Sequence, residues 1–246
     1  MKSVAIFKRT ANFGIIADSC NVIAKINTDF PTKFGIPRQS GLVKTKAKII
    51  FEEAFRDESA LRGLEEFSHL WLIWGFSQNA ETNWSPTVRP PRLGGNKRVG
   101  VFATRSPNRP NPLGLSSVKI EKIFRDGQNG TVITVSGADL LDGTPIYDIK
   151  PYLAYTDSHP DAVGGFADTV FGDDLAVEFS EECKKKVTPE DLENLITILQ
   201  SDPRPHYHTD DRVYAFEYAK YHIEFRVENG VLKVLSVDNL KDGNNV

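Results

Sequence analysis

The sequence predicts a mainly β domain, closed or nearly closed into a barrel, followed by a small α+β domain. Many short apolar runs of strand length are bounded by turn residues, and little helical periodicity separates them. Parallel βαβ units need crossover helices that this part of the chain does not offer, so a closed β arrangement is favoured. The composition changes near residue 180, where a long helical pattern follows.

The strands of the first domain are expected at short intervals along the chain. HLWLIWGF at residues 69–76 is a continuous apolar run of strand length, which predicts a buried central strand. GTVITVSG at residues 130–137 is bounded by glycines and indicates another strand. A short helical stretch is expected at residues 58–67. Further strand candidates lie at residues 21–30, 47–55, 99–105, 115–124 and 146–149, the last after a turn at Asp142-Gly143.

The second domain is predicted from a helix and a hairpin. Thr188 is suited to cap a helix that begins with Pro189, and Leu192, Leu195, Ile196 and Leu199 fall on one face of it. Asn229-Gly230 lies between two β patterns and is a strong two-residue turn signal. We expect an extension over residues 1–21, a β domain over residues 22–180 and an α+β domain over residues 181–246.

The composition is that of a globular chain without a strong overall charge. Its 246 residues are 40% hydrophobic and carry a formal net charge of −3, so any attraction to anions must come from a local patch. Cys20 and Cys183 form no CxxC pair and are expected to be reduced thiols in a cytoplasmic protein. We find no signal-peptide pattern and no run long and apolar enough to span a membrane.

The segment RPPRLGGNKRVGVFATRSPNRPNPLG at residues 89–114 supplies such a patch. It holds six Lys and Arg residues, five prolines and no acid. Prolines stiffen a loop, and the planar guanidinium group of arginine suits phosphate or carboxylate. The segment therefore predicts a preformed anion-binding surface, with RNA or a nucleotide as the partner. The alternative is a solvated loop, and spacing alone does not separate a binding protein from an enzyme.

Other chemical motifs are weak or absent. No GxGxxG motif follows a strand and no Walker A lysine motif occurs. His206 and His208 have no evident third ligand, so no metal site is expected. The carboxylates of Asp139, Asp142 and Asp148 either serve turns or hold hydroxyl and ammonium groups of a ligand, and both interpretations stay open.

Five stretches in this order resemble a known family: FGIPRQSGLV, GLEEFSHLWLIWGF, the Arg/Pro segment, DLLDGTPIYDIKPYL and DPRP. They are similar to the tRNA adenosine N6-methyltransferases that act on threonylcarbamoyladenosine at position 37, beside the anticodon. The resemblance covers about residues 22–235. It implies an S-adenosylmethionine-dependent enzyme with a β-barrel cofactor domain, a small C-terminal domain and a homodimeric, cytoplasmic state.

The resemblance also implies which residues contact the methyl donor. Arg105 is expected to pair with the donor's carboxylate, and Asp139 or Asp142 to accept from its hydroxyl or ammonium groups. The family often has Pro where Ser40 stands and His where Ser77 stands, substitutions that a backbone contact tolerates. The full expected set is Ser40, Gly41, Leu42, Ser77, Gln78, Arg105, Leu115, Asp139, Leu140, Leu141 and Asp142.

The tRNA is expected to meet the remaining arginines. Arg89, Arg92, Arg98 and Arg109 are expected to grip phosphates of the anticodon stem-loop, which presents unpaired bases. Asp202, Pro203 and Arg204 either help to seat the tRNA or serve the end of the preceding helix. No residue is assigned as a catalytic base. The alternatives are a non-catalytic RNA-binding β-barrel protein and a hydrolase or isomerase of phosphorylated small molecules.

Overall fold

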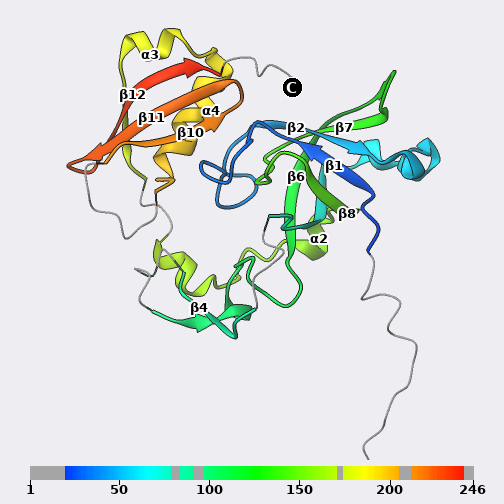
Figure 1. Cartoon of the computed structure of the whole chain (residues 1–246). Coiled ribbons are helices and arrows are strands. Elements are labelled where there is room, and N and C mark those ends of the chain that lie inside the picture. Colours follow the sequence, from blue (N-terminus) through cyan, green and yellow to red (C-terminus); the bar gives the residue numbers. More distant parts are fainter. Residues whose placement is uncertain are drawn as a thin grey trace, which may run out of the picture.

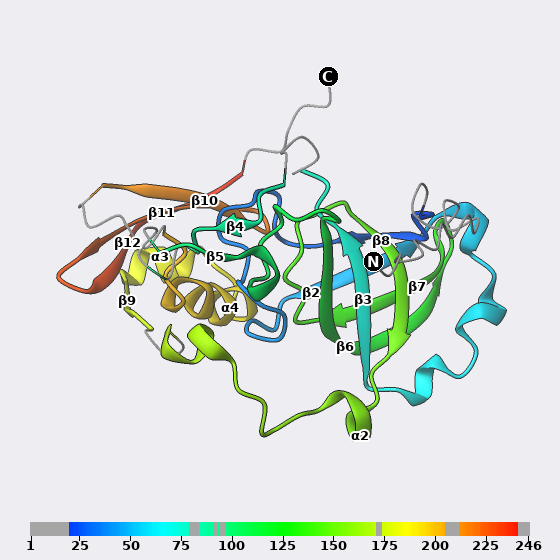
Figure 2. The same cartoon turned by 90° about the horizontal axis from the view of Figure 1, so that it is seen from below.

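The computed structural model describes residues 20–78, 84–90, 93, 97–170, 174–204 and 212–240. Six strands form one antiparallel sheet, in which each strand pairs with two neighbours and the sheet closes on itself. Figure 2 shows this closed sheet beside the smaller second sheet. The mainly β prediction is confirmed. Around the ring the strands are β1 (Ala24–Asn27), β2 (Lys46–Phe51), β7 (Gly130–Ser136), β6 (Leu113–Asp126), β3 (His69–Gly75) and β8 (Thr144–Pro151).

The interior of this barrel is filled by apolar side chains that alternate along the strands. Ile26, Ile49, Leu72, Ile133 and Ile146 come from five different strands and are all fully buried. A strand turns successive side chains to opposite faces, so one face fills the barrel while the other faces outward. β3 follows this rule although it is apolar after His69: Leu70, Leu72 and Trp74 are buried, and the residues between them are half-buried.

Three sequence predictions in this part of the chain are wrong in detail. Residues 99–105 form a strand only over β5 (Val99–Gly100), which pairs with β4 (Thr87–Val88). The 3₁₀ helix η5 (Val101–Ala103) follows, because the chain turns to bury Val101 and the Thr104 hydroxyl closes the turn on the Val101 carbonyl at 2.8 Å. The short β4–β5 hairpin projects away from the barrel (Figure 1).

The helical stretch expected over residues 58–67 is broken. It forms two short 3₁₀ helices, η2 (Glu58–Leu61) and η3 (Leu64–Glu66), with Gly63 between them at φ +86°. This left-handed backbone conformation interrupts a helix and favours glycine. The strand expected over residues 47–55 likewise ends at Phe51, and η1 (Glu53–Phe55) follows it.

The second sheet has four strands in the order β10 (Tyr214–Tyr218), β11 (Tyr221–Glu228), β12 (Val231–Asn239) and β9 (Ala176–Phe179). The predicted hairpin is confirmed: Asn229 and Gly230 join β11 to β12 with φ angles of +51° and +78°. β9 pairs with β12 in parallel, so this sheet includes a strand that precedes residue 181.

Two helices, α3 (Glu181–Lys185) and α4 (Pro189–Gln200), pack against this sheet. The predicted cap is confirmed, since the Thr188 hydroxyl accepts a hydrogen bond from the backbone N–H of Asp191. The buried face of α4 contains Leu195 and Leu199 as expected, and Ile198 in place of Ile196.

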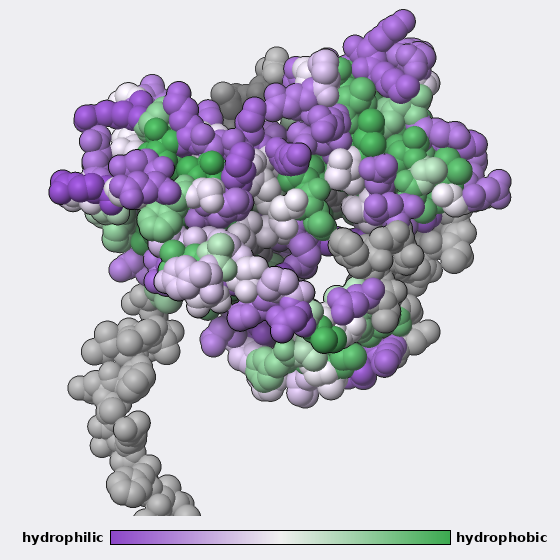
Figure 3. All heavy atoms as spheres, turned by 180° about the vertical axis from the view of Figure 1, so that it is seen from behind, coloured by the Kyte–Doolittle hydropathy of each residue, from purple (hydrophilic) through white to green (hydrophobic). Residues whose placement is uncertain are grey.

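The connection from the barrel to the second sheet contains α2 (Ala154–Asp157) and η6 (Gly165–Val170). In Figure 2 this long connection passes below both sheets. The surface seen from behind is largely hydrophilic, with apolar patches interspersed (Figure 3). Within the described ranges, no helix is long and apolar enough to cross a membrane.

Candidate functional site

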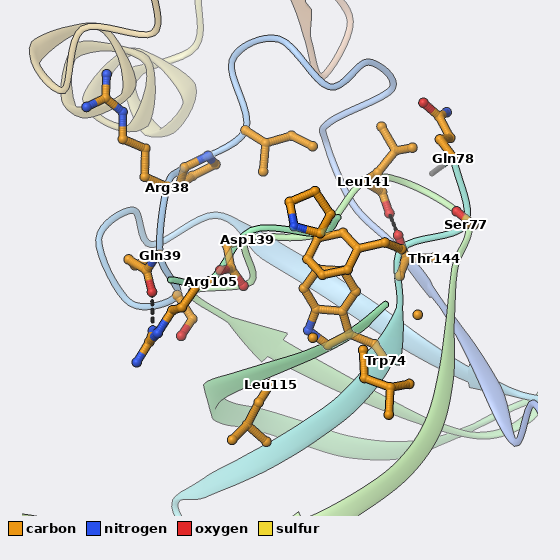
Figure 4. A pocket seen from close by; sticks show the side chains of 18 of the residues that line it. Arg38, Gln39, Trp74, Ser77, Gln78, Arg105, Leu115, Asp139, Leu141 and Thr144 are labelled. Atoms are coloured by element: carbon orange, nitrogen blue, oxygen red, sulfur yellow. Dashed lines mark hydrogen bonds between the residues drawn. The ribbon is translucent and has the colours of Figure 1, made fainter. Parts of the chain in front are cut away.

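A cavity of about 1020 Å³ opens where one end of the barrel meets the loops that surround it. The segment of residues 36–40 forms one wall, and the end of β3 with Phe76, Ser77 and Gln78 forms another. The Arg/Pro segment and the loop before β8 complete it (Figure 4). Ligand-binding cavities in proteins commonly have this size, with apolar walls and a few converging polar groups.

A chain of hydrogen bonds lies at the base of the cavity. The Trp74 indole N–H donates to the Ser116 hydroxyl at 3.0 Å, and that hydroxyl donates to Oδ1 of Asp139 at 2.6 Å. Burial raises the pKa of Asp139, while hydrogen bonds from Ser116 and the charge of Arg105 act in the opposite direction. The arrangement keeps a desolvated carboxylate in a fixed position on the wall of the cavity.

Arg105 provides the positive charge on the same cavity. Its guanidinium group donates a hydrogen bond to Oε1 of Gln39, the contact drawn as a dashed line in Figure 4. Arg105 also lowers the pKa of Asp139 through its charge, so the two groups lie close enough to interact electrostatically. A carboxylate and a guanidinium group side by side can bind a ligand that carries both charges.

Close packing shapes the apolar wall. The Trp74 and Phe76 rings contact each other with centroids 4.4 Å apart. The Trp74 ring lies against the backbone of Gly114, where an added Cβ would come within 2.2 Å of it. Gly75 is equally confined, since a Cβ there would meet the Tyr147 hydroxyl at 2.6 Å. Glycine at position 114 thus leaves room for the Trp74 ring in the wall, and glycine at position 75 leaves room for Tyr147.

The structure brings most of the residues expected to contact the methyl donor to this cavity. Seven of them line it: Ser40, Ser77, Gln78, Arg105, Leu115, Asp139 and Leu141. The backbone of Ser40 also acts to lower the pKa of Asp139, so these two lining residues lie close together.

Four of the expected residues do not line the cavity. The Gly41 N–H donates to the Gly137 carbonyl at 2.8 Å, and Leu42 is exposed. Leu140 is fully buried in the barrel core. Asp142 accepts a hydrogen bond from the backbone N–H of Thr28 at 2.9 Å, which ties the turn before β8 to the end of β1. The turn interpretation therefore holds for Asp142.

The arginines expected to contact tRNA lie in two places. Arg109 lines the cavity and its guanidinium donates to the Thr104 carbonyl at 3.2 Å. Arg89 and Arg98 are exposed on the β4–β5 hairpin, where Arg98 donates to the Thr87 hydroxyl at 2.7 Å. Arg92 lies outside the described residues, as do His206 and His208.

Asp202 and Arg204 bind each other. The Arg204 guanidinium contacts both carboxylate oxygens of Asp202 at 2.9 and 3.0 Å, and the two side chains are 14% and 11% exposed. Arg204 also lies over the Tyr214 ring at 6.0 Å. This paired and largely buried geometry favours a structural role just beyond α4.

The sequence did not single out Arg38 and Gln39, which line the cavity, or Ser116, which holds Asp139. Trp74 is buried, as the apolar run at residues 69–76 predicts, and it also lines the cavity. Arg38 and Gln39 adjoin Ser40 in the stretch FGIPRQSGLV, so the resemblance marked their neighbourhood. Ser116 carries no local signal, because its role depends on pairing β6 beside β3 and on the approach of Asp139.

Comparison with known proteins identifies the family. The tRNA-methyltransferase O N-terminal domain matches residues 25–158, and the TrmO C-terminal domain matches residues 172–240. A tRNA (adenine(37)-N6)-methyltransferase of Escherichia coli strain K12 is 38% identical over 226 residues, which cover 88% of this chain and 96% of that protein. One from Eikenella corrodens is 47% identical over 175 residues, covering 70% of this chain and 97% of that protein.

A solved structure agrees with this result over nearly the whole fold. The crystal structure of TrmO from P. aeruginosa superposes with a TM-score of 0.70 and 32% sequence identity, covering 91% of this chain and 97% of that chain. Both family domains, the relatives and the fold therefore point to one assignment, and the chain belongs to the tRNA-methyltransferase O family.

Proposed function

We propose that this protein transfers a methyl group from S-adenosylmethionine to N6 of adenosine 37 in tRNA. The substrate nucleoside at this position is threonylcarbamoyladenosine. The names of the relatives support the activity. The observation that carries it is the cavity in which Asp139 and Arg105 present opposite charges beside an aromatic wall. The same relatives make a non-catalytic RNA-binding barrel the less favoured alternative.

The residues around the cavity fit S-adenosylmethionine. The carboxylate of this donor suits Arg105, and its ammonium group and ribose hydroxyls suit Asp139. Its flat adenine suits the Trp74–Phe76 wall. When bound, the donor supplies an electrophilic methyl group on a sulfonium centre. Gly114 leaves the room that the Trp74 ring occupies in this wall.

The protein's contribution to methyl transfer is then mainly orientation. The accepting nitrogen must lie in line with the bond that breaks, and correct placement alone can lower the barrier by about 7–11 kcal/mol in favourable cases. The Ser116 hydroxyl, which accepts from the Trp74 indole, fixes the Asp139 carboxylate by a hydrogen bond, so this group does not have to reorganise when it binds a ligand.

The RNA is proposed to approach from the side of the Arg/Pro segment. Arg109 lines the cavity, and Arg89 and Arg98 are exposed on the adjoining hairpin. Lysine and arginine side chains that neutralise phosphates supply much of the affinity for nucleic acid. The single-stranded anticodon loop can then present one unstacked base to the cavity.

We further propose a homodimer in the cytoplasm, where tRNA is found. Large apolar side chains are exposed near the cavity on β6 and η5, with Phe102 73% and Leu115 58% exposed, and a second copy would cover them. The chain is proposed to divide into an extension over residues 1–21, a barrel domain and a smaller domain. The pairing of β9 with β12 favours a boundary before residue 176.

One experiment tests the activity directly. The protein is incubated with S-adenosylmethionine carrying a labelled methyl group and with tRNA that has or lacks the threonylcarbamoyl group. We expect label only in the threonylcarbamoylated tRNA, at position 37. RNA binding without any transfer would favour the non-catalytic barrel, and indifference to RNA would favour the small-molecule enzyme.

A further inference from the structure

The segment of residues 28–43, which joins β1 to β2, belongs physically to both parts of the molecule. Phe30 and Val43 are buried in the apolar core of the second sheet, and the Phe34 ring stacks on Tyr214 with centroids 6.2 Å apart. Residues of the same segment form one wall of the cavity at the end of the barrel. The second sheet therefore sets the position of a wall of the site.

Gly35 brings this segment unusually close to the second sheet. Its φ angle is +94°, and a Cβ added to it would lie 2.3 Å from the Phe216 ring. Since Phe216 is itself buried in the core of the second sheet, the segment cannot shift at this point without disturbing that core. The backbone that leads to Arg38, Gln39 and Ser40 is therefore fixed in position.

Arg38 makes the next attachment to the C-terminal part. Its guanidinium group donates to the backbone carbonyl of Asp202, and Figure 4 shows the side chain directed away from Trp74. Asp202 has a left-handed backbone with φ +48°, and its carboxylate binds Arg204. The ion pair holds this backbone conformation, so the carbonyl that receives Arg38 has a fixed direction.

Gln39 points the opposite way, toward Arg105. Its side-chain oxygen accepts the hydrogen bond from the Arg105 guanidinium above the cavity (Figure 4). Arg105 is exposed, so without a partner its long side chain would sample many rotamers. Fixing one of them on ligand binding costs side-chain entropy and lowers the affinity. A fixed acceptor at Gln39 restricts Arg105 to orientations that face the cavity.

We propose that Arg38 and Gln39 are positioning residues through which the C-terminal domain orients Arg105 for the carboxylate of the methyl donor. This inference rests on the proposed function, since it assumes that Arg105 binds that carboxylate. It gives the Asp202–Arg204 pair a part in donor binding without contact with the ligand. The C-terminal domain then contributes to the cofactor site as well as to any contact with tRNA.

The test measures binding of S-adenosylhomocysteine, the demethylated donor, to the full chain by isothermal titration calorimetry. Arg105→Ala should raise the dissociation constant about tenfold or more, because a hydrogen-bonded charge pair is lost. Arg38→Ala and Gln39→Ala should each raise it about threefold or more. In the Arg105→Ala background, both substitutions should have no further effect, and Arg38→Lys should restore part of the affinity.

This double-mutant design separates positioning from general damage to the fold. Additive losses in the Arg105→Ala background, or unchanged affinity in Gln39→Ala, would overturn the inference while leaving the proposed function standing. If the wild-type chain does not bind S-adenosylhomocysteine, the inference and the proposed function are both contradicted. Gln39→Ala keeps the test decisive even if Arg38→Ala does not fold, because Gln39 is only partly buried.

Glu228→Gln is the matched control. It removes a carboxylate that pairs with Arg226 at 2.8 Å and with Lys233 at 3.1 Å in the same part of the chain, and it does not touch the segment of residues 28–43. Its affinity for S-adenosylhomocysteine should equal that of the wild type. A comparable loss in this variant would show that any weakened ion pair in the domain lowers binding, and would also overturn the inference.

Discussion

The Ser116 hydroxyl, buried on β6, donates a 2.6 Å hydrogen bond to Oδ1 of Asp139, which lines the cavity. The contact holds a carboxylate in an environment that disfavours its charge. Functional sites often retain such groups at a cost to stability, because a desolvated charge binds a ligand more strongly than a solvated one. The balance between stability and binding at Asp139 can be measured.

Asp139→Asn should change the pH dependence of stability. Burial raises the pKa of Asp139 above 3.8, so the folded state favours the protonated form. The stability that this group contributes is fully present below pH 3.8 and is lost as the pH rises through its raised folded-state pKa. The melting temperature of Asp139→Asn should therefore rise relative to the wild type across that window, while its affinity for S-adenosylhomocysteine falls.

Asp126→Asn is the control of opposite sign. Hydrogen bonds from the backbone N–H groups of Gln128 and Asn129 lower the pKa of Asp126, so its stabilising contribution is present above pH 3.8 and is lost as the pH falls through its lowered folded-state pKa. This variant should be less stable than the wild type near neutral pH. Parallel pH profiles for the two variants would contradict the burial argument.

Arg105→Ala should abolish methyl transfer to tRNA and leave the fold intact. The side chain is exposed and does not pack in the apolar core. Its removal therefore takes a positive charge from the site and has little effect on the stability of the fold. Transfer of labelled methyl groups and thermal unfolding are the two measurements. Arg125→Ala, which removes an arginine paired with Glu58 on the surface, should retain activity. Full activity of Arg105→Ala would exclude this arginine from donor binding.

Gly114→Ala should destabilise the protein by about 1–3 kcal/mol, because the new methyl group would overlap the Trp74 ring and force it to move. Gly100→Ala has open space around its Cβ and an ordinary φ of −58°, so it is the matched control. Chemical denaturation gives both free energies of unfolding. Equal free energies of unfolding for the two variants would mean that the Trp74 ring can move aside at little cost.

Arg89→Ala should weaken tRNA binding and flatten its dependence on salt. Each phosphate contact contributes about 0.7 to 0.9 to the slope of log K against log salt concentration, so loss of one contact should lower the slope by about that amount. Filter binding over a series of salt concentrations measures it. Lys184→Ala, on the outer face of α3, should leave the slope unchanged. An unaltered slope in Arg89→Ala would remove this residue from the phosphate contacts.

The sequence anticipated elements whose signals are local. The Asn229-Gly230 turn and the Thr188 cap depend on a few adjacent residues, and both formed as predicted. The apolar runs at residues 69–76 and 130–137 likewise became strands. Where local preference was weak, as at residues 99–105, the chain buries Val101 and the predicted strand forms only over Val99–Gly100.

The sequence by itself determined the family, the mainly β character and seven donor-site residues that do line the cavity, because the stretches that carry them are contiguous. Tertiary structure alone decided how they act. Ser116 reaches Asp139, and Gln39 reaches Arg105, across separations of 23 and 66 residues that no periodicity encodes. It also showed Asp202 and Arg204 bound to each other. Such pairings depend on closure of the sheet and on its packing against the C-terminal sheet, which are properties of the whole chain.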